Sequence, residues 1–155
     1  MASTINKANL TVTLKEQVKI NNQEYGNRNS IEIGGVNDVS QRIISVPVAD
    51  TTILLKLSGS VGAGTFGIDN LKYARLTNLD NQNWVRLSFI SSSDTPASFN
   101  RYDVKLEARQ SYIFTNSAVS GSQVGADFNA FAKFTDLKAK ADTAAVDLEL
   151  FIATS

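Results

Sequence analysis

The chain of 155 residues lacks two residue types that carry much of enzyme chemistry, because it contains neither cysteine nor histidine. Without cysteine there is no disulfide, no thiolate nucleophile and no cysteine-ligated metal. Without histidine, the commonest general base and the commonest transition-metal ligand are both missing, and no Ser-His-Asp triad can form. These absences argue against an enzyme, and we expect no catalytic residue, no metal site and no cofactor.

An excess of charge of one sign and long apolar runs are also missing. Fifteen basic residues balance 15 acidic ones and no basic block is present, so we expect no nucleic-acid partner. The longest apolar runs are far shorter than the roughly 20 residues of a membrane-spanning helix, so we expect no membrane partner. The N-terminal stretch MASTINKANL has no apolar centre, and we do not expect a signal peptide there.

What the chain does contain is about ten short strand-like runs, separated by clusters of turn residues. Apolar and polar residues alternate most clearly over residues 10–14, 31–36, 85–89, 102–106 and 146–152. Alternation with a period of two indicates strands that bury one face and expose the other. The pattern therefore predicts an all-β fold, a single-domain antiparallel β-sandwich of jelly-roll type.

Two segments do not follow the alternation. Residues 1–9 show no periodicity, and we predict an N-terminal arm there, followed by a sandwich domain over residues 10–155. Residues 122–136 fit either a strand or one face of a helix. We favour a loop that leads into a strand from Leu137, and the alternatives stay open.

The stretch ARLTNLDNQNWVRLSF, residues 74–89, predicts a hairpin of two strands joined by a polar turn, and it holds the only tryptophan. Asp80 and Asn83 could offer oxygen ligands to calcium, but their spacing is not that of an EF-hand loop, so a plain turn is preferred. Trp84 could build a sugar-stacking platform together with Tyr102 and Tyr112, although packing in the core is favoured for a lone tryptophan. These five residues are the candidate contacts for a partner or a sugar.

The same stretch also carries a family resemblance. With YDVKLEARQSYIFTN after it and LKAKADTAAVDLELFIAT at the end, it resembles small β-rich structural proteins of tailed-bacteriophage virions. In that pattern a strand ends in TNLD-x-x-N and an apolar or aromatic residue starts the next strand. Residues 73–116 and 137–153 match, and the N-terminal stretch INNQEYGNRNSIEIGGVNDVSQRIISVP fits a similar opening, in which a first hairpin leads to a Val-Pro. The glycine turn that is common after the KL strand is replaced here by EARQS.

The resemblance implies a non-enzymatic virion protein, and among these a capsid decoration (cement) protein that stabilises the capsid through subunit contacts. A tail, neck or fibre-associated virion protein is the alternative within the class, and a carbohydrate-binding β-sandwich is the alternative outside it. The implied partners are other virion proteins, the major capsid protein foremost, and copies of the chain itself, with a trimer favoured. We further hypothesise that the arm over residues 1–9 docks on a neighbouring subunit.

Overall fold

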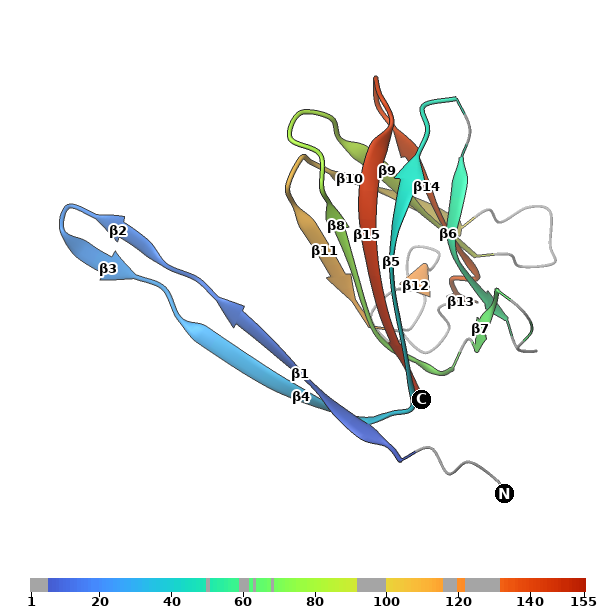
Figure 1. Cartoon of the computed structure of the whole chain (residues 1–155), viewed down its shortest axis with the longest axis horizontal. Helices are drawn as coiled ribbons and strands as arrows, with labels where there is room; N and C mark the ends of the chain where they lie inside the picture. The colour runs from blue at the N-terminus through green and yellow to red at the C-terminus, as the bar shows by residue number, and fades with distance from the viewer. Residues whose placement is uncertain are drawn as a thin grey trace.

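The computed structural model describes residues 6–49, 51–58, 62, 64–67, 69–91, 100–115, 120–121 and 132–155. These residues form fifteen strands and no helix, which confirms the predicted all-β class. Two parts are visible in Figure 1: a sandwich of two sheets, and a long hairpin that projects away from it. The alternation of apolar and polar residues in the sequence did not distinguish this hairpin from the strands of the sandwich.

The sandwich consists of a four-stranded sheet, in the order β11-β8-β15-β5, and a five-stranded sheet, in the order β10-β9-β14-β6-β7. The first sheet contains β5 (Asp38–Val46), β8 (Leu71–Asn78), β11 (Ser111–Phe114) and β15 (Val146–Thr154). The second contains β6 (Thr52–Ser58), β7 (Phe66–Gly67), β9 (Val85–Ser91), β10 (Asn100–Leu106) and β14 (Asp136–Ala141). A short pair, β12 (Ser120–Gly121) with β13 (Ala132–Lys133), forms a sheet of its own.

The eight long strands of the sandwich pair in a nested order. The first pairs with the last (β5 with β15), the second with the seventh (β6 with β14), then β8 with β11 and β9 with β10, all antiparallel. Successive nested pairs alternate between the two sheets. This is the winding of a jelly roll, in which one long antiparallel ribbon is rolled into two sheets, and the predicted architecture is confirmed.

The core lies between the two sheets, and the alternation predicted its inward faces correctly. On β9 the inward side chains Val85, Leu87 and Phe89 are at most 2% exposed. On β15 the alternate residues are fully buried: Val146, Leu148, Leu150 and Ile152. Leu137 is likewise buried on β14, which confirms a strand at that position. Of the ambiguous segment, residues 122–131 lie outside the described residues, whereas Ala132–Lys133 form the short strand β13 and β14 begins at Asp136, where we favoured a loop.

The predicted hairpin between β8 and β9 is wrong, because these two strands belong to opposite sheets and do not pair. Residues 79–84 instead form an arch from one sheet to the other. The buried Asn78 holds this arch: its Nδ2 donates to the main-chain oxygens of Asn83 at 2.9 Å and Leu106 at 3.3 Å. Its Oδ1 accepts the main-chain N–H of Asp80 at 2.9 Å. A polar turn serves hairpins and arches equally, so the local sequence does not distinguish them.

The projecting hairpin, called the arm from here on, is built from β1 (Ala8–Lys15) and β4 (Arg28–Val36), with β2 (Val18–Ile20) and β3 (Gln23–Tyr25) at its tip. The tip turns through Asn21 and Asn22, whose φ angles of 48° and 67° suit the two-residue turn that matches the twist of paired strands. At Gly26, with φ of 137°, a Cβ atom would lie 2.1 Å from the Glu16 carbonyl oxygen, so only glycine fits there.

The base of the arm rests on a second, smaller hydrophobic cluster. Its buried members are Val36, Tyr73 and Ala153, and partly buried arm residues pack against them. The arm continues directly into β5 through Asn37, whose N–H donates to the Thr154 carbonyl oxygen at 2.8 Å. The arm thus spans residues 8–36, an element that the division into residues 1–9 and 10–155 did not include. Residues 1–5 lie outside the described residues, so docking by residues 1–9 stays a prediction.

Candidate functional site

The outer face of the four-stranded sheet lies next to the base of the arm. Its outward side chains alternate with buried ones such as Leu76 and Leu150. Strand register aligns the outward residues of all four strands into rows. One row contains Ile113, Arg75, Phe151 and Gln41, and the next contains Ser111, Thr77, Glu149 and Ile43.

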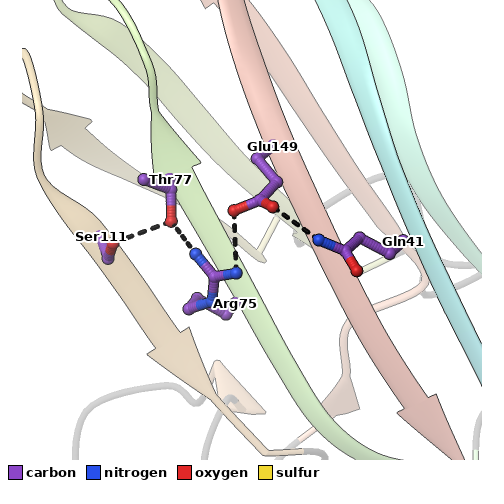
Figure 2. A network of polar contacts seen from close by, with 5 residues as sticks. All are labelled: Gln41, Arg75, Thr77, Ser111 and Glu149. Atoms are coloured by element: carbon purple, nitrogen blue, oxygen red, sulfur yellow. Dashed lines mark hydrogen bonds and ion pairs between the residues drawn. The ribbon is translucent and has the colours of Figure 1, made fainter. Parts of the chain in front are cut away.

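Five of these side chains form a continuous network, the polar belt, which Figure 2 shows crossing from β5 to β11. Gln41 Nε2 donates to Glu149 Oε1 at 2.7 Å, and the Arg75 guanidinium lies 2.8 Å from Glu149 Oε2. Arg75 also donates to Thr77 Oγ1, which is 2.8 Å from Ser111 Oγ. The hydrogen bonds from Gln41 and Arg75 lower the pKa of Glu149. The belt therefore links its five side chains through hydrogen bonds and keeps its ion pair at neutral pH.

Apolar side chains lie on both sides of the polar belt. Val39, Ile43 and Ile113 are 50%, 64% and 48% exposed. Between this face and residues 10–14 of the arm lies an open groove of about 300 Å³, lined on the sheet side by Tyr73, Arg75, Ile113 and Phe151. The arm therefore does not cover the outer face of its own sheet.

The arm itself is amphipathic. Strand register places Val12 opposite Ile31 and Leu10 opposite Ile33, so one face of the ribbon is apolar. The other face is polar and carries Thr13, which is hydrogen-bonded to Ser30 at 2.6 Å. Beyond the base, five large apolar side chains of the arm are 49–56% exposed: Leu14, Val18, Ile20, Tyr25 and Ile31. The arm and the outer face together form the candidate interaction site.

The two turn residues among the predicted contacts, Asp80 and Asn83, hold the arch together. Asp80 Oδ1 accepts the main-chain N–H groups of Asn83 and Gln82, both at 2.7 Å, and these bonds lower the pKa of Asp80. Asn83 Oδ1 accepts a hydrogen bond from Thr143 Oγ1 at 2.7 Å. This geometry agrees with the preferred turn interpretation, in which both side chains serve the local backbone.

Trp84 lies at one end of the sandwich, partly buried and outside the buried core cluster. The Nζ atom of Lys105 lies 5.1 Å from the centre of its ring, a cation–π contact. Beside it is a hollow of about 180 Å³ that Trp84 lines with Arg86, Lys140, Ala141 and Asp142. In the part of the chain that the structure describes, the buried Nε of Arg86 has no hydrogen-bond partner. The hollow thus offers one aromatic ring and charged side chains of both signs.

Tyr102 and Tyr112 lie elsewhere, on the edge strands β10 and β11, where they close one side of the sandwich. Their hydroxyl groups are hydrogen-bonded to each other, and the Tyr102 ring stacks on Phe89 with centroids 4.8 Å apart. Burial, together with this hydrogen bond, raises the pKa of Tyr102 far above its ordinary value. Phe89 is five residues from Trp84 on an extended strand, roughly 17 Å along it. The structure therefore does not bring the tryptophan and the tyrosines into one sugar platform.

The resemblance implied a first hairpin in the N-terminal region, but sequence reasoning missed that this hairpin projects from the sandwich as an arm, and it missed the polar belt. The arm had a local signal in VKINNQEY, where two asparagines separate short runs that alternate. The belt had none, because Gln41, Arg75 and Glu149 meet only after three distant strands pair.

Comparison with known proteins supplies no relative. No protein-family model matches the chain, and no curated protein or solved structure matches it. Within the described ranges, no three His, Cys, Asp or Glu side chains gather where they could hold a metal. The same ranges contain no helix of the length and apolarity needed to cross a membrane.

Proposed function

We propose that the chain is a non-enzymatic structural subunit of a bacteriophage particle, specifically a capsid decoration protein located in the virion. The observation that carries the proposal is the arm. An isolated two-stranded hairpin is only marginally stable in water, and this one exposes five large apolar side chains beyond its base. Such an element gains stability when a partner covers its apolar face, as happens between the subunits of an assembly.

The fold is compatible with this function but does not select it. Jelly rolls occur in capsid proteins and in lectins alike, so architecture alone carries no function. The resemblance of residues 73–116 and 137–153 to tailed-phage structural proteins favours the virion. The expected partners are the major capsid protein and further copies of the chain. A place in the tail, the neck or a fibre is the alternative position within the same particle.

In this function the surface is the working part of the molecule. The exposed apolar face of the arm would supply hydrophobic contact area. The outer face of the sheet, whose polar belt is linked by its own hydrogen bonds, would supply a surface that a neighbour can cover. Each contact needs only modest affinity, since many subunits on one particle bind together and avidity multiplies the effect. The proposal includes no cofactor, no nucleic acid and no membrane.

The test is to measure the chain in purified particles of the phage that encodes it. Particles are separated on a density gradient and the chain is quantified by mass spectrometry against the major capsid protein. We expect it to co-sediment with the particles at a fixed ratio. A ratio matching the capsid lattice supports decoration, and a few copies per particle place it in the tail or neck. Recovery only in the particle-free fraction would refute the proposal.

The hollow beside Trp84 favours a second candidate, a carbohydrate-binding module. A glycan array tests it, with Trp84→Ala as the variant and Tyr25→Ala on the arm as the matched aromatic control. Saturable binding that Trp84→Ala abolishes and Tyr25→Ala preserves would establish the sugar site. Absence of saturable binding by the unaltered chain would remove this candidate.

A further inference from the structure

We infer that the arm of one copy packs its apolar face on the outer face of the four-stranded sheet of a second copy. This deepens the proposed function, because it names the partner of the arm, and it rests on that function for its place in the particle. The self-association itself is a property of the purified chain. Its test can therefore fail separately from the test of particle binding.

The first argument is that one chain carries two unpartnered surfaces of matching chemistry. The apolar face of the arm is exposed beyond its base, and the outer face of the sheet exposes Val39, Ile43 and Ile113. The groove between them shows that the arm diverges from its own sheet after Leu10 and Val12 have packed at the base. Figure 1 shows the tip of the arm, β2 and β3, far from the sandwich, where a neighbouring subunit can reach it.

The second argument is that the two surfaces match in length. The paired strands of the arm contain 8 and 9 residues, and β15 and β5 of the sheet contain 9 residues each. At roughly 3.4 Å per residue, both surfaces extend about 30 Å. Leu10, Val12 and Ile33 already pack on the lower end of their own sheet, so the ribbon of a second copy can cover the part of the outer face beyond this base, at the usual sheet-to-sheet spacing.

The third argument is area. A half-exposed aliphatic or aromatic side chain presents on the order of 100 Å². Five such side chains on the arm and three on the sheet therefore offer roughly 800 Å² for each arm that docks. In a dimer in which each copy docks its arm on the other, the two arms would bury roughly 1,600 Å² in total, the area of a standard stable interface. In a ring, each subunit docks one arm on its neighbour, so the buried area per subunit is the same.

The fourth argument is that the polar belt opposes burial less than unpaired charges would. Glu149 accepts from both Gln41 and Arg75, and Arg75 also donates to Thr77. Covering an ion pair has a desolvation cost, and this cost is smallest where the two charges already have each other and further hydrogen bonds as partners, as they do here. The chain also has no net charge, so two copies do not repel each other overall.

The fifth argument is that the arm is free to reach a neighbour. It joins the sandwich through a single chain connection, residues 35–37, and only three residues are buried in the cluster at its base. Gly35, in this connection, adopts a positive φ of 75°, a backbone angle that glycine takes more readily than other residues. Exchange of an identical element between copies is a low-cost route to a dimer, and an element attached by one strand and a small cluster is suited to it.

The first experiment measures mass by size-exclusion chromatography with light scattering at about 100 μM chain, a concentration that reveals micromolar affinities. We expect a dimer or a closed ring. The double variant Leu14→Lys and Ile31→Lys, on the apolar face, should weaken association at least about 100-fold, since it puts two charges into an apolar contact. The control Thr11→Lys with Ser30→Lys, two polar-face positions that are diagonal to each other on the same two strands, as Leu14 and Ile31 are, should keep the mass of the unaltered chain.

Two results of this experiment would overturn the inference. One is a monomer at that concentration, and the other is an oligomer whose mass the apolar-face variant leaves unchanged. All four substituted positions are solvent-exposed, so circular dichroism can verify that both variants keep the sandwich.

The second experiment uses the absence of cysteine, which makes every introduced thiol unique. One chain carries Leu14→Cys on the arm, another carries Ile43→Cys on the sheet, and the two are mixed under oxidising conditions. We expect a mixed disulfide between the two chains, with Thr13→Cys replacing Leu14→Cys as the control that couples poorly. Equal yields from the two pairs would overturn the inference, since the apolar face of the arm would then not lie against the sheet of a second copy.

Discussion

The arch between β8 and β9 leads to a quantitative prediction about Asn78. This side chain is fully buried and makes three hydrogen bonds: two donated to the main-chain oxygens of Asn83 and Leu106, and one accepted from the N–H of Asp80. The substitution Asn78→Ala removes all three and leaves the backbone groups without these partners. Because the site is closed to solvent, water does not readily replace the amide.

The magnitude follows from these three bonds. Each contributes roughly 0.5–1.5 kcal/mol, and the bond at 3.3 Å belongs at the lower end. We therefore expect Asn78→Ala to lower the free energy of unfolding by about 3 kcal/mol. For a chain of this size that corresponds to a fall in Tm of about 6–12 °C.

Urea unfolding followed by circular dichroism measures this loss directly. The matched control is Asn81→Ala in the same arch, where the asparagine is exposed and the expected change is within about 0.5 kcal/mol. If the two variants were equally stable, the amide of Asn78 would not be what holds the arch, and the reasoning would be refuted.

Three further predictions concern other parts of the chain. The hydrogen bond from Gln41 is the largest cause of the lowered pKa of Glu149, so the stability that this carboxylate contributes is present above its ordinary pKa of 4.5 and is lost as pH falls through the lower pKa of the folded state. In a plot of the urea unfolding midpoint against pH, Glu149→Gln should therefore make the decline at acid pH shallower, and an unchanged decline would contradict this. Burial raises the pKa of Tyr102, so the stability from its neutral form is present below the ordinary tyrosine pKa of about 10 and declines as pH rises beyond it. Tyr102→Phe should make that alkaline decline shallower, and a decline as steep as in the unaltered chain would count against the assignment. Gly26→Ala would place a Cβ 2.1 Å from the Glu16 carbonyl oxygen and so disturb the pairing in which the Glu16 N–H donates to the Asn27 oxygen. Hydrogen exchange at the Glu16 amide should therefore accelerate while the amides of β15 stay protected. Equal acceleration at both would show that the arm and the sandwich unfold as one unit.

Part of the candidate site was readable from the sequence and part was not. The turn chemistry of Asp80 and Asn83 was predictable, because an aspartate accepts main-chain N–H groups two and three residues ahead of it. Trp84 was expected to pack at one end of the sandwich because it comes at the start of a strand, whereas the hollow that it lines there had no signal in the sequence. Arg75 and Glu149 are separated by 74 positions, and no local pattern indicates that they pair.

The strands and their inward faces follow from the pattern of residues along the chain. Alternation with a period of two states which side chains point inward on each strand, and the fully buried row on β15 follows from it. The class followed too, since many short alternating runs separated by turns can bury a core only as stacked sheets.

The order of the strands within each sheet cannot be read from the local sequence, because it depends on the tertiary fold. The pairing of β5 with β15 joins residues more than 90 positions apart, and it depends on how both sheets close over a shared core. For the same reason the step from β8 to β9 became an arch between sheets instead of a hairpin. In the arm, apolar and polar residues alternate as they do in the sandwich, but β1 and β4 pair only with each other. The apolar face that the alternation predicts to be buried therefore stays exposed beyond the base.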